Sequence, residues 1–408
     1  MVGHAADDRC PGVLRLAEAA DGYLARIRLP GGLIDAGQIR VLARLAGKFG
    51  DGRVELTSRG NVQLRALAAG AAGPLTDELT RAGLLPSLSH DRVRNVLASP
   101  LAGLDGGPDL TGIVRDLDAA LCARPRLAEL SGRFLFAVDD GRGDVAGLGA
   151  DVTARVGADG IVVNGLATRD RGSGDGVVAA MLACAEAFLD EAAAQGGTAW
   201  RIADLADGDE RVRAVVAARL GLATASQPTA AREPTAALNP TAAPRPTTGP
   251  EPAVVPQGTA AGSRAPTRPV GLVGPGGTAV VLLAPLGRLT AGQLTWLAGQ
   301  VTGRSARITP WRSVVVPDLA DAAATLDEAA QLGFGVDDTS PWLRLTACAG
   351  RPGCASALAD VQADAAAFGA RWPDRIVHVS GCARHCGRPA ATQIDVTATS
   401  QGYHVAGV

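Results

Sequence analysis

The sequence of 408 residues has one lysine, Lys48, among its 39 lysine and arginine residues, so nearly all of its positive charge is arginine. A guanidinium group binds a carboxylate through a planar, bidentate fork. The formal net charge of −2 gives no reason to expect binding to nucleic acid or attraction to a membrane.

Long apolar runs are also missing, because no stretch of about 18 apolar residues suggests a membrane span. Residues 1–16 contain acidic side chains and no apolar core of a secretory signal, so we expect a cytoplasmic protein. In that compartment the seven cysteines are not expected to form a disulfide framework. Cys122 and Cys184 fall on helical patterns as buried thiols, and Cys10 stands alone near the N-terminus.

Large apolar residues are scarce between about Ala223 and Val270, a segment rich in proline, threonine and alanine. Such a segment buries too little surface to offset the entropy of ordering. The sequence therefore predicts a disordered linker over residues 223–270 that divides the chain into two parts.

The two parts resemble each other. Residues 22–67 read as a strand, a glycine-containing turn, a helix introduced by Asp35, and two further strands. Residues 278–319 repeat that order, with Thr290 in the place of Asp35 and the same Ala-Gly-Gln after it. Aspartate and threonine are favoured N-cap residues, so each marks the start of a helix. The duplicated β-α-β-β unit predicts a pseudo-two-fold molecule with a site where the halves meet.

Each repeat is followed by alternating helices and strands. After the first repeat we expect helices over 109–123 and 176–195 and strands over 133–140, 151–156 and 161–164. After the second we expect a helix over Ala355–Phe368 and strands over 375–380 and 393–398. The pattern indicates an α+β fold with mixed sheets and no clean doubly wound order.

Four of the cysteines form two glycine- and proline-rich pairs, Cys348-x5-Cys354 and Cys382-x3-Cys386. Four thiolates brought together in this way can hold one [4Fe–4S] cluster. The helix expected after Cys354 would direct its free amides and its dipole at such a cluster. Structural zinc sites usually use CxxC pairs, and neither pair has that spacing, so the sequence favours iron–sulfur over zinc.

With these motifs the chain resembles the nitrite/sulfite reductase superfamily. The likeness is carried by TACAGRPGC (346–354), HVSGCARHCGRP (378–389), LTSRGNVQL (56–64) and RVRNV (92–96). SPLAGLDG (99–106) and GRFLFAVDDG (132–141) resemble the precorrin-3B synthase branch. The resemblance implies duplicated ferredoxin-like β-α-β-β units, over 1–85 and 271–333, plus two nitrite/sulfite reductase-type α/β domains, over 86–222 and 334–408, with pseudo-two-fold symmetry.

The same resemblance implies an oxygen-dependent monooxygenase of aerobic cobalamin biosynthesis that hydroxylates precorrin-3A at C20 and forms a lactone, giving precorrin-3B. It implies a [4Fe–4S] cluster on Cys348, Cys354, Cys382 and Cys386 and an active centre near Cys386, which in sirohaem relatives bridges cluster and haem. A mononuclear non-haem iron is also implied. The sequence shows no ligand pattern for it, and His90-Asp91 is the one adjacent His–carboxylate pair.

No dinucleotide or flavin motif is evident, so NADH-derived electrons would come from a separate reductase or a ferredoxin. The tetrapyrrole substrate carries acetate and propionate groups, which need several cations around the pocket. The residues expected to bind it are Arg59, Arg94, Asn95, Arg133, Arg312, Arg384 and Arg388. Arg65 and Arg307 are interpreted as solvated surface charges.

Sirohaem reductases carry two basic residues, two positions apart, on one strand. Here the first of these positions is Arg133, but the second is Leu135. The loss of one cation favours a large macrocycle over sulfite or nitrite as the ligand. Two alternatives stay open. A sirohaem-dependent sulfite or nitrite reductase would show strong visible absorption beyond the cluster's band. A non-catalytic metalloprotein with a four-cysteine zinc site would contain zinc and no acid-labile sulfide.

Overall fold

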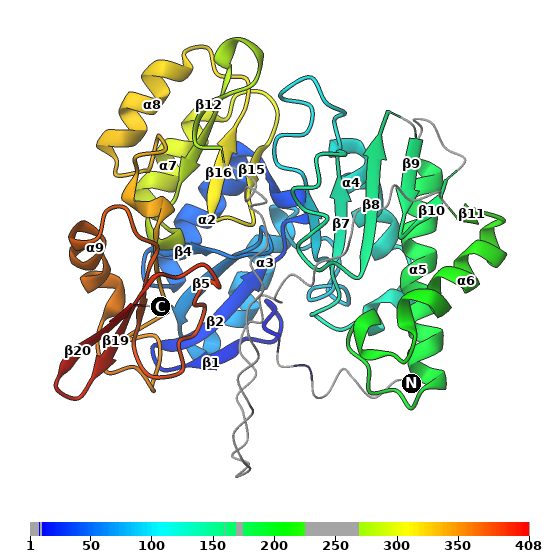
Figure 1. The fold of residues 1–408 in the computed structure, drawn as a ribbon, viewed down its shortest axis with the longest axis horizontal. Coiled ribbons are helices and arrows are strands. Elements are labelled where there is room, and N and C mark those ends of the chain that lie inside the picture. Colours follow the sequence, from blue (N-terminus) through cyan, green and yellow to red (C-terminus); the bar gives the residue numbers. More distant parts are fainter. Residues whose placement is uncertain (1–7, 9, 159, 169–173, 225–268, 408) are drawn as a thin grey trace.

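The computed structural model describes residues 8, 10–158, 160–168, 174–224 and 269–407 (Figure 1). Most of the linker predicted over 223–270 lies outside these residues, so it stays a prediction. The described residues form four β-sheets with helices packed on them. The α+β class with mixed sheets, expected from the sequence, is confirmed.

Two five-stranded antiparallel sheets are built by exchange between the repeats. Sheet A has the order β1 (Ala17–Ala19), β2 (Gly22–Ile27), β5 (Val62–Leu67), β4 (Arg53–Leu56) and β14 (Arg288–Thr290). Sheet B has the order β12 (Gly271–Val273), β13 (Ala279–Leu283), β16 (Ser313–Val316), β15 (Ala306–Ile308) and β3 (Leu33–Ile34). Each repeat thus completes the sheet of the other, which joins segments more than 200 residues apart in sequence into one unit.

The repeat helices α2 (Ala36–Phe49) and α7 (Ala291–Gln300) pack against each other beneath the two sheets. Asp35 accepts a hydrogen bond from the Gln38 amide at 2.8 Å, and the Gln38 side chain accepts one from the Asp35 amide at 3.2 Å. Thr290 and Gln293 form the same reciprocal capping box. The predicted helix starts are confirmed because a cap depends on only the first turn of the helix.

The other two sheets are mixed. Sheet C has the order β6 (Val96–Ala98), β7 (Phe136–Asp139), β8 (Val152–Gly157), β9 (Gly160–Val163), β10 (Leu166–Ala167) and β11 (Ala223–Thr224). Sheet D has the order β17 (Leu345–Ala347), β18 (Val377–Ser380), β19 (Ile394–Thr399) and β20 (Gly402–Gly407). In both, three parallel strands are followed by an antiparallel one, so the pseudo-symmetry extends beyond the repeats.

The remaining helices cover the sheets. They are α3 (Ala72–Arg81), α4 (Thr111–Cys122), α5 (Asp175–Ala194), α6 (Gly208–Leu220), α8 (Ala322–Gln331) and α9 (Val361–Arg371). Helix α5 packs on α4 and on sheet C, and α9 packs on sheet D. Among the described residues, no helix combines the length and the apolar character needed to cross a lipid bilayer.

Helix α9 differs from its prediction, because it begins at Val361 instead of directly after Cys354. Asp360 caps it, accepting a hydrogen bond from the Ala363 amide at 3.2 Å. The segment before it is turn, held by a hydrogen bond from the Leu358 amide to the Gly381 carbonyl at 2.7 Å. The expectation that this helix begins beside Cys354 and aims its amides at a cluster is therefore wrong.

Candidate functional site

The four cysteines lie in two loops at the carboxyl ends of neighbouring parallel strands. The first loop follows β17 and the second follows β18, so both leave sheet D at the same edge. The Gly381 amide donates a hydrogen bond to Cys348 Sγ at 3.1 Å. Burial raises the pKa of the Cys386 thiol, and the charges of Cys348, Cys382 and Cys354 raise it further. The structure thus places the two cysteine loops side by side at one edge of sheet D.

The two cysteine loops approach each other closely at Gly381, whose carbonyl accepts a hydrogen bond from the Leu358 amide at 2.7 Å. A Cβ at Gly381 would lie 2.7 Å from the Ala357 Cβ, so the close approach of the loops requires glycine here.

The first cysteine loop is tied to sheet A by Arg65. Its side chain is buried, pairs with Asp21 at 3.1 Å and donates to the Gly353 carbonyl at 2.7 Å. Arg307 is buried as well and donates to the Pro100 and Ala102 carbonyls, each at 2.7 Å. The interpretation of both as solvated surface charges is wrong, because other domains cover the polar faces on which they lie.

Sheet A presents a row of polar side chains on the face that meets the cysteine loop. Arg26 pairs in register with Gln63, Gln63 with Glu55, and Glu55 with Arg288. Arg26 donates to Gln63 Oε1 at 3.0 Å, and Arg288 donates to Glu55 at 2.6 Å. Two residues beyond Arg26, Arg28 continues the same side of the chain.

Arg28 is the functional candidate that the sequence analysis missed. It is only 2% exposed, and its Nε and Nη2 have no hydrogen-bond partner. Among the described residues, the one hydrogen bond of its side chain is a long contact of 3.4 Å from Nη1 to the Arg26 carbonyl. Burial lowers the pKa of Arg28 to about 9. A buried cation with unused donors indicates a ligand, and the alternation Arg26-Ile27-Arg28 was the available signal.

Arg59, Asn95 and Arg133 gather around Gly132. Arg59 Nη1 and Asn95 Nδ2 both donate to the Gly132 carbonyl, each at 3.1 Å. Burial lowers the pKa of Arg59. Arg133 is exposed and lies over the Trp200 ring, 4.6 Å from its centroid. Burial is the main cause of the lowered pKa of Arg28, and the positive charges of Arg26 and Arg59 lower it further.

Arg94 is not brought to this group. Its Nε and Nη2 form a bidentate pair with Asp118, each at 2.7 Å, and Nη1 donates to the Leu84 carbonyl at 3.1 Å. Every nitrogen of the buried guanidinium is engaged, so the side chain links the segment before β6 to α4. We leave Arg94 out of the proposed substrate set.

His90 and Asp91 are also engaged locally. His90 Nδ1 contacts Ser87 Oγ at 2.8 Å, and its Nε2 contacts the Arg124 carbonyl at 3.1 Å. Asp91 accepts hydrogen bonds from the Val13 and Leu14 amides at 2.7 and 3.1 Å. Asp91 thus holds the N-terminal segment and His90 ties its own turn to the Arg124 carbonyl, so we do not propose them as iron ligands.

Arg312, Arg384 and Arg388 gather near the second cysteine pair. Arg388 pairs with Asp395 at 2.8 Å. Arg384 is exposed, and its positive charge offsets part of the rise in the pKa of the Cys386 thiol. Burial lowers the pKa of His378 to about 4, and the charge of Arg312 contributes to that shift. Arg384 and Arg388 thus belong to the second cysteine loop, and Arg312 acts on His378 of the preceding strand β18.

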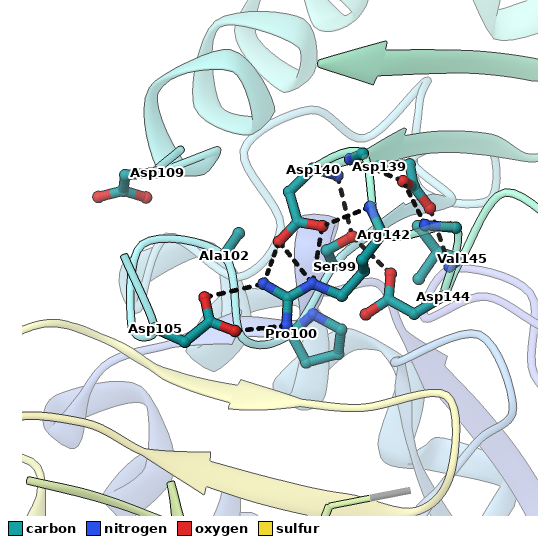
Figure 2. A network of polar contacts seen from close by, with 12 residues as sticks. Ser99, Pro100, Ala102, Asp105, Asp109, Asp139, Asp140, Arg142, Asp144 and Val145 are labelled. Atoms are coloured by element: carbon teal, nitrogen blue, oxygen red, sulfur yellow. Dashed lines mark hydrogen bonds and ion pairs between the residues drawn. The ribbon is translucent and has the colours of Figure 1, made fainter. Parts of the chain in front are cut away.

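The loops of sheet C that correspond to the cysteine loops carry carboxylates instead (Figure 2). Oxygens of Asp139, Asp140 and Asp144 lie within 4.8 Å of one another. Arg142 pairs with Asp140 and, at 2.7 and 2.9 Å, with Asp105. Arg142 thus offsets only part of the acidic charge of these loops.

Asp139 organises its loop by accepting four backbone hydrogen bonds between 2.9 and 3.2 Å, from Gly141, Gly143, Val145 and Ala146. An Asp139→Asn change would turn an amide donor toward these donors. We expect it to lower the free energy of unfolding by about 3 kcal/mol, measured by urea denaturation, with no loss of iron or sulfide. Asp144→Asn is the matched control, because Asp144 accepts from Ser99 Oγ and asparagine keeps an acceptor. Equal stability of the two variants would contradict this role for Asp139.

Comparisons with known proteins agree with the site. Residues 16–82 match the nitrite/sulfite reductase ferredoxin-like half domain. A precorrin-3B synthase from Sinorhizobium sp is 26% identical over 97% of this chain and 81% of its own length. A ferredoxin–nitrite reductase from Leptolyngbya laminosa is 33% identical, but over only 28% of this chain and 24% of that protein.

The solved structure of the Mycobacterium tuberculosis NirA protein has the same fold, with a TM-score of 0.69 and 20% identity over 94% of this chain and 73% of that one. The half-domain match, the likeness to a precorrin-3B synthase along nearly the whole chain and this shared fold all fit the nitrite/sulfite reductase superfamily.

Proposed function

We propose that the chain is an oxygen-dependent oxidoreductase of the precorrin-3B synthase type, with a [4Fe–4S] cluster on Cys348, Cys354, Cys382 and Cys386. The observation that carries this proposal is the similarity to a precorrin-3B synthase over 97% of the chain. The position of both cysteine loops at the same edge of sheet D supports the cluster. A cytoplasmic location and an external electron donor, either a ferredoxin or a reductase, belong to the same proposal.

The arginines of both halves would hold the carboxylates of precorrin-3A. Arg28 and Arg59 supply cations from sheet A and its adjoining loop, and Arg312, Arg384 and Arg388 supply them from the second half. Each charge-assisted hydrogen bond in a partly dry pocket contributes about 1.5–3 kcal/mol, so a few are enough for micromolar binding. Arg133 would contact the outer edge of the ligand, because it is exposed beside Trp200.

Leu135 supports a macrocycle substrate over a small oxyanion. Its side chain is buried in an apolar cluster with Leu97, Ala137 and Val145. The position that is basic in sirohaem reductases therefore adds no cation to this site. The alternative of a sirohaem-dependent sulfite or nitrite reductase retains the support of the local match to nitrite reductases.

When bound, the iron–sulfur cluster supplies electrons one at a time, and a mononuclear iron supplies the means to activate O₂. One oxygen atom would enter the macrocycle at C20 and the other would leave as water, with a pair of electrons and protons from the donor. The chain's own part is to orient the ring by its carboxylates and to exclude water beneath it. Asn95 positions Gly132 and, through it, Arg59.

The test is anaerobic purification followed by quantification of iron, acid-labile sulfide and extractable tetrapyrrole, and then turnover with precorrin-3A, O₂ and a chemical reductant. We expect a cluster, no sirohaem and a hydroxylated lactone product by mass spectrometry. Stoichiometric sirohaem with sulfite or nitrite reduction would favour the alternative. Zinc without sulfide would exclude both enzymes.

A further inference from the structure

The segment before β1 crosses from sheet A to the domain of sheet C. We call Asp8 and Cys10–Arg15 the N-terminal strap. On one side of the strap, the Arg26 amide of β2 donates a hydrogen bond to the Gly12 carbonyl at 3.2 Å. On the other side, the Gly132 amide donates one to Asp8 Oδ2 at 2.6 Å. The strap therefore joins β2 to the turn that precedes β7.

Asp8 is the most firmly held residue of the strap. Its side chain is 2% exposed, and Oδ1 accepts a hydrogen bond from the Cys10 amide at 2.9 Å. Arg92 Nη1 lies 3.2 Å from Oδ2 and donates to the Asp8 carbonyl at 2.9 Å. Burial by itself would raise the pKa of Asp8, but the hydrogen bonds from Gly132 and Cys10 and the charge of Arg92 outweigh burial and lower that pKa. Asp8 is therefore a carboxylate near neutral pH.

Gly132 is held from both sides. Its amide donates to Asp8, and its carbonyl accepts from Arg59 Nη1 and Asn95 Nδ2, each at 3.1 Å. A Cβ at Gly132 would lie 2.7 Å from the Cys10 Cβ, so the strap can approach this closely only because the residue is glycine. Asp8 thus fixes the residue whose carbonyl holds the Arg59 side chain.

Asp91 provides a second clamp on the strap. Its Oδ2 accepts hydrogen bonds from the Val13 and Leu14 amides at 2.7 and 3.1 Å. A Cβ at Gly12 would lie 2.2 Å from the same oxygen, so an alanine there would displace the strap. The charge of Asp91 also acts on the buried Arg28. Two buried carboxylates thus fasten the strap close to the cation whose Nε and Nη2 have no partner among the described residues.

We infer that Asp8 is a positioning residue of the ligand pocket and that the N-terminal strap closes this pocket at Arg28 and Arg59. The group bound there is a carboxylate of the ligand, because the free nitrogens of Arg28 are donors on a cation. A charge-assisted hydrogen bond is stronger where water is excluded, so closure by the strap raises the affinity for that carboxylate. Only the choice of a tetrapyrrole as ligand rests on the proposed function, and the two clamps rest on the geometry.

The first test measures ligand affinity in the full chain, reconstituted anaerobically with iron and sulfide. Uroporphyrin, a tetrapyrrole rich in carboxylates, is the probe. In Asp8→Asn only one of the two amides keeps its acceptor, so the strap and the Gly132 turn lose their shared clamp. We expect the dissociation constant for the probe, measured by equilibrium dialysis, to rise about tenfold with unchanged sulfide content.

Asp139→Asn is the matched control for this substitution. Asp139 is also a buried carboxylate that accepts backbone amides, but it lies at the end of β7 and does not contact the strap. It should lose stability and keep the affinity for the probe. An equal loss of probe affinity in Asp139→Asn would show that Asp8 acts only through stability and would overturn its positioning role.

The second test follows the strap itself and needs no ligand. In Gly12→Ala the added Cβ conflicts with Asp91, which frees the strap while every arginine and carboxylate is kept. We expect iodoacetamide to alkylate Cys10 several-fold faster than in the wild-type chain, measured by peptide mass spectrometry. Cys122, which is half-buried like Cys10, is the internal reference. Saturating uroporphyrin should slow the alkylation of Cys10 in the wild-type chain.

The outcomes separate this inference from the proposed function. Wild-type affinity for the probe in both Asp8→Asn and Gly12→Ala would overturn the inference alone. Unchanged alkylation of Cys10 in Gly12→Ala would overturn the closure by the strap, whether or not the probe binds. A wild-type chain that carries a cluster but binds no uroporphyrin, with fast Cys10 alkylation in Gly12→Ala, would instead overturn the tetrapyrrole substrate of the proposed function.

Discussion

A Cys386→Ser variant is expected to assemble no [4Fe–4S] cluster and to have no oxygenation activity. The four proposed ligands come from two loops that meet only at the edge of sheet D, so three thiolates leave one corner of the cubane without its protein ligand. The hydroxyl of serine is a far weaker ligand because it stays protonated near neutral pH. Acid-labile sulfide and the broad visible absorption of the cluster are the measurements.

The matched control is Cys122→Ser, because Cys122 lies at the end of α4 on a different sheet. That variant should keep wild-type sulfide content. In the wild-type chain burial raises the pKa of the Cys122 thiol to about 11, as expected of an inert cysteine. Full sulfide and normal product formation by Cys386→Ser would show that the cluster is held elsewhere.

Replacement of Arg28 by methionine is expected to stabilise the fold and to weaken substrate binding. The buried guanidinium has two nitrogens without partners, so its removal should raise the free energy of unfolding by about 1–3 kcal/mol. Loss of one charge-assisted hydrogen bond to a substrate carboxylate should raise the dissociation constant roughly 10–100-fold. Urea denaturation and a direct binding titration with precorrin-3A measure the two effects.

Arg94→Met gives the opposite result and serves as the control. Arg94 is paired with Asp118, so its removal leaves a carboxylate without its partner and should cost about 3 kcal/mol of stability. Substrate affinity of the folded fraction should stay unchanged. If Arg28→Met destabilises the protein as Arg94→Met does, then Arg28 has a structural role and no ligand in the pocket.

The local signals of the sequence predicted the secondary structure well. The Asp35 and Thr290 caps and the strand over Val62–Leu67 lie where expected, because each depends on a few neighbouring residues. The start of α9 was misplaced because Asp360 caps it while the preceding turn is held by Gly381, which comes more than 20 residues later. The exchange of β3 and β14 was not predicted either, since pairing partners are selected by the packing of the two repeats.

The arginines show the same division more clearly. Family motifs placed Arg94 in the site. Its guanidinium instead forms a bidentate pair with Asp118, which lies 24 residues away on helix α4. Arg65 was interpreted as a surface charge, yet it is buried and donates a hydrogen bond to the Gly353 carbonyl of the cysteine loop, 288 residues away. Arg28 was overlooked, although its unsatisfied donors now make it the stronger candidate.

By itself the sequence determined the duplication, the helix caps and the four thiols with their spacing, because these depend on residue type and on short stretches of chain. Tertiary structure alone decided which arginines are free to bind a ligand and placed Asp8 beside Gly132. The physical reason is that the burial and pairing of a charged side chain are set by strands and loops that are distant in sequence. Those elements become neighbours only when the sheets assemble.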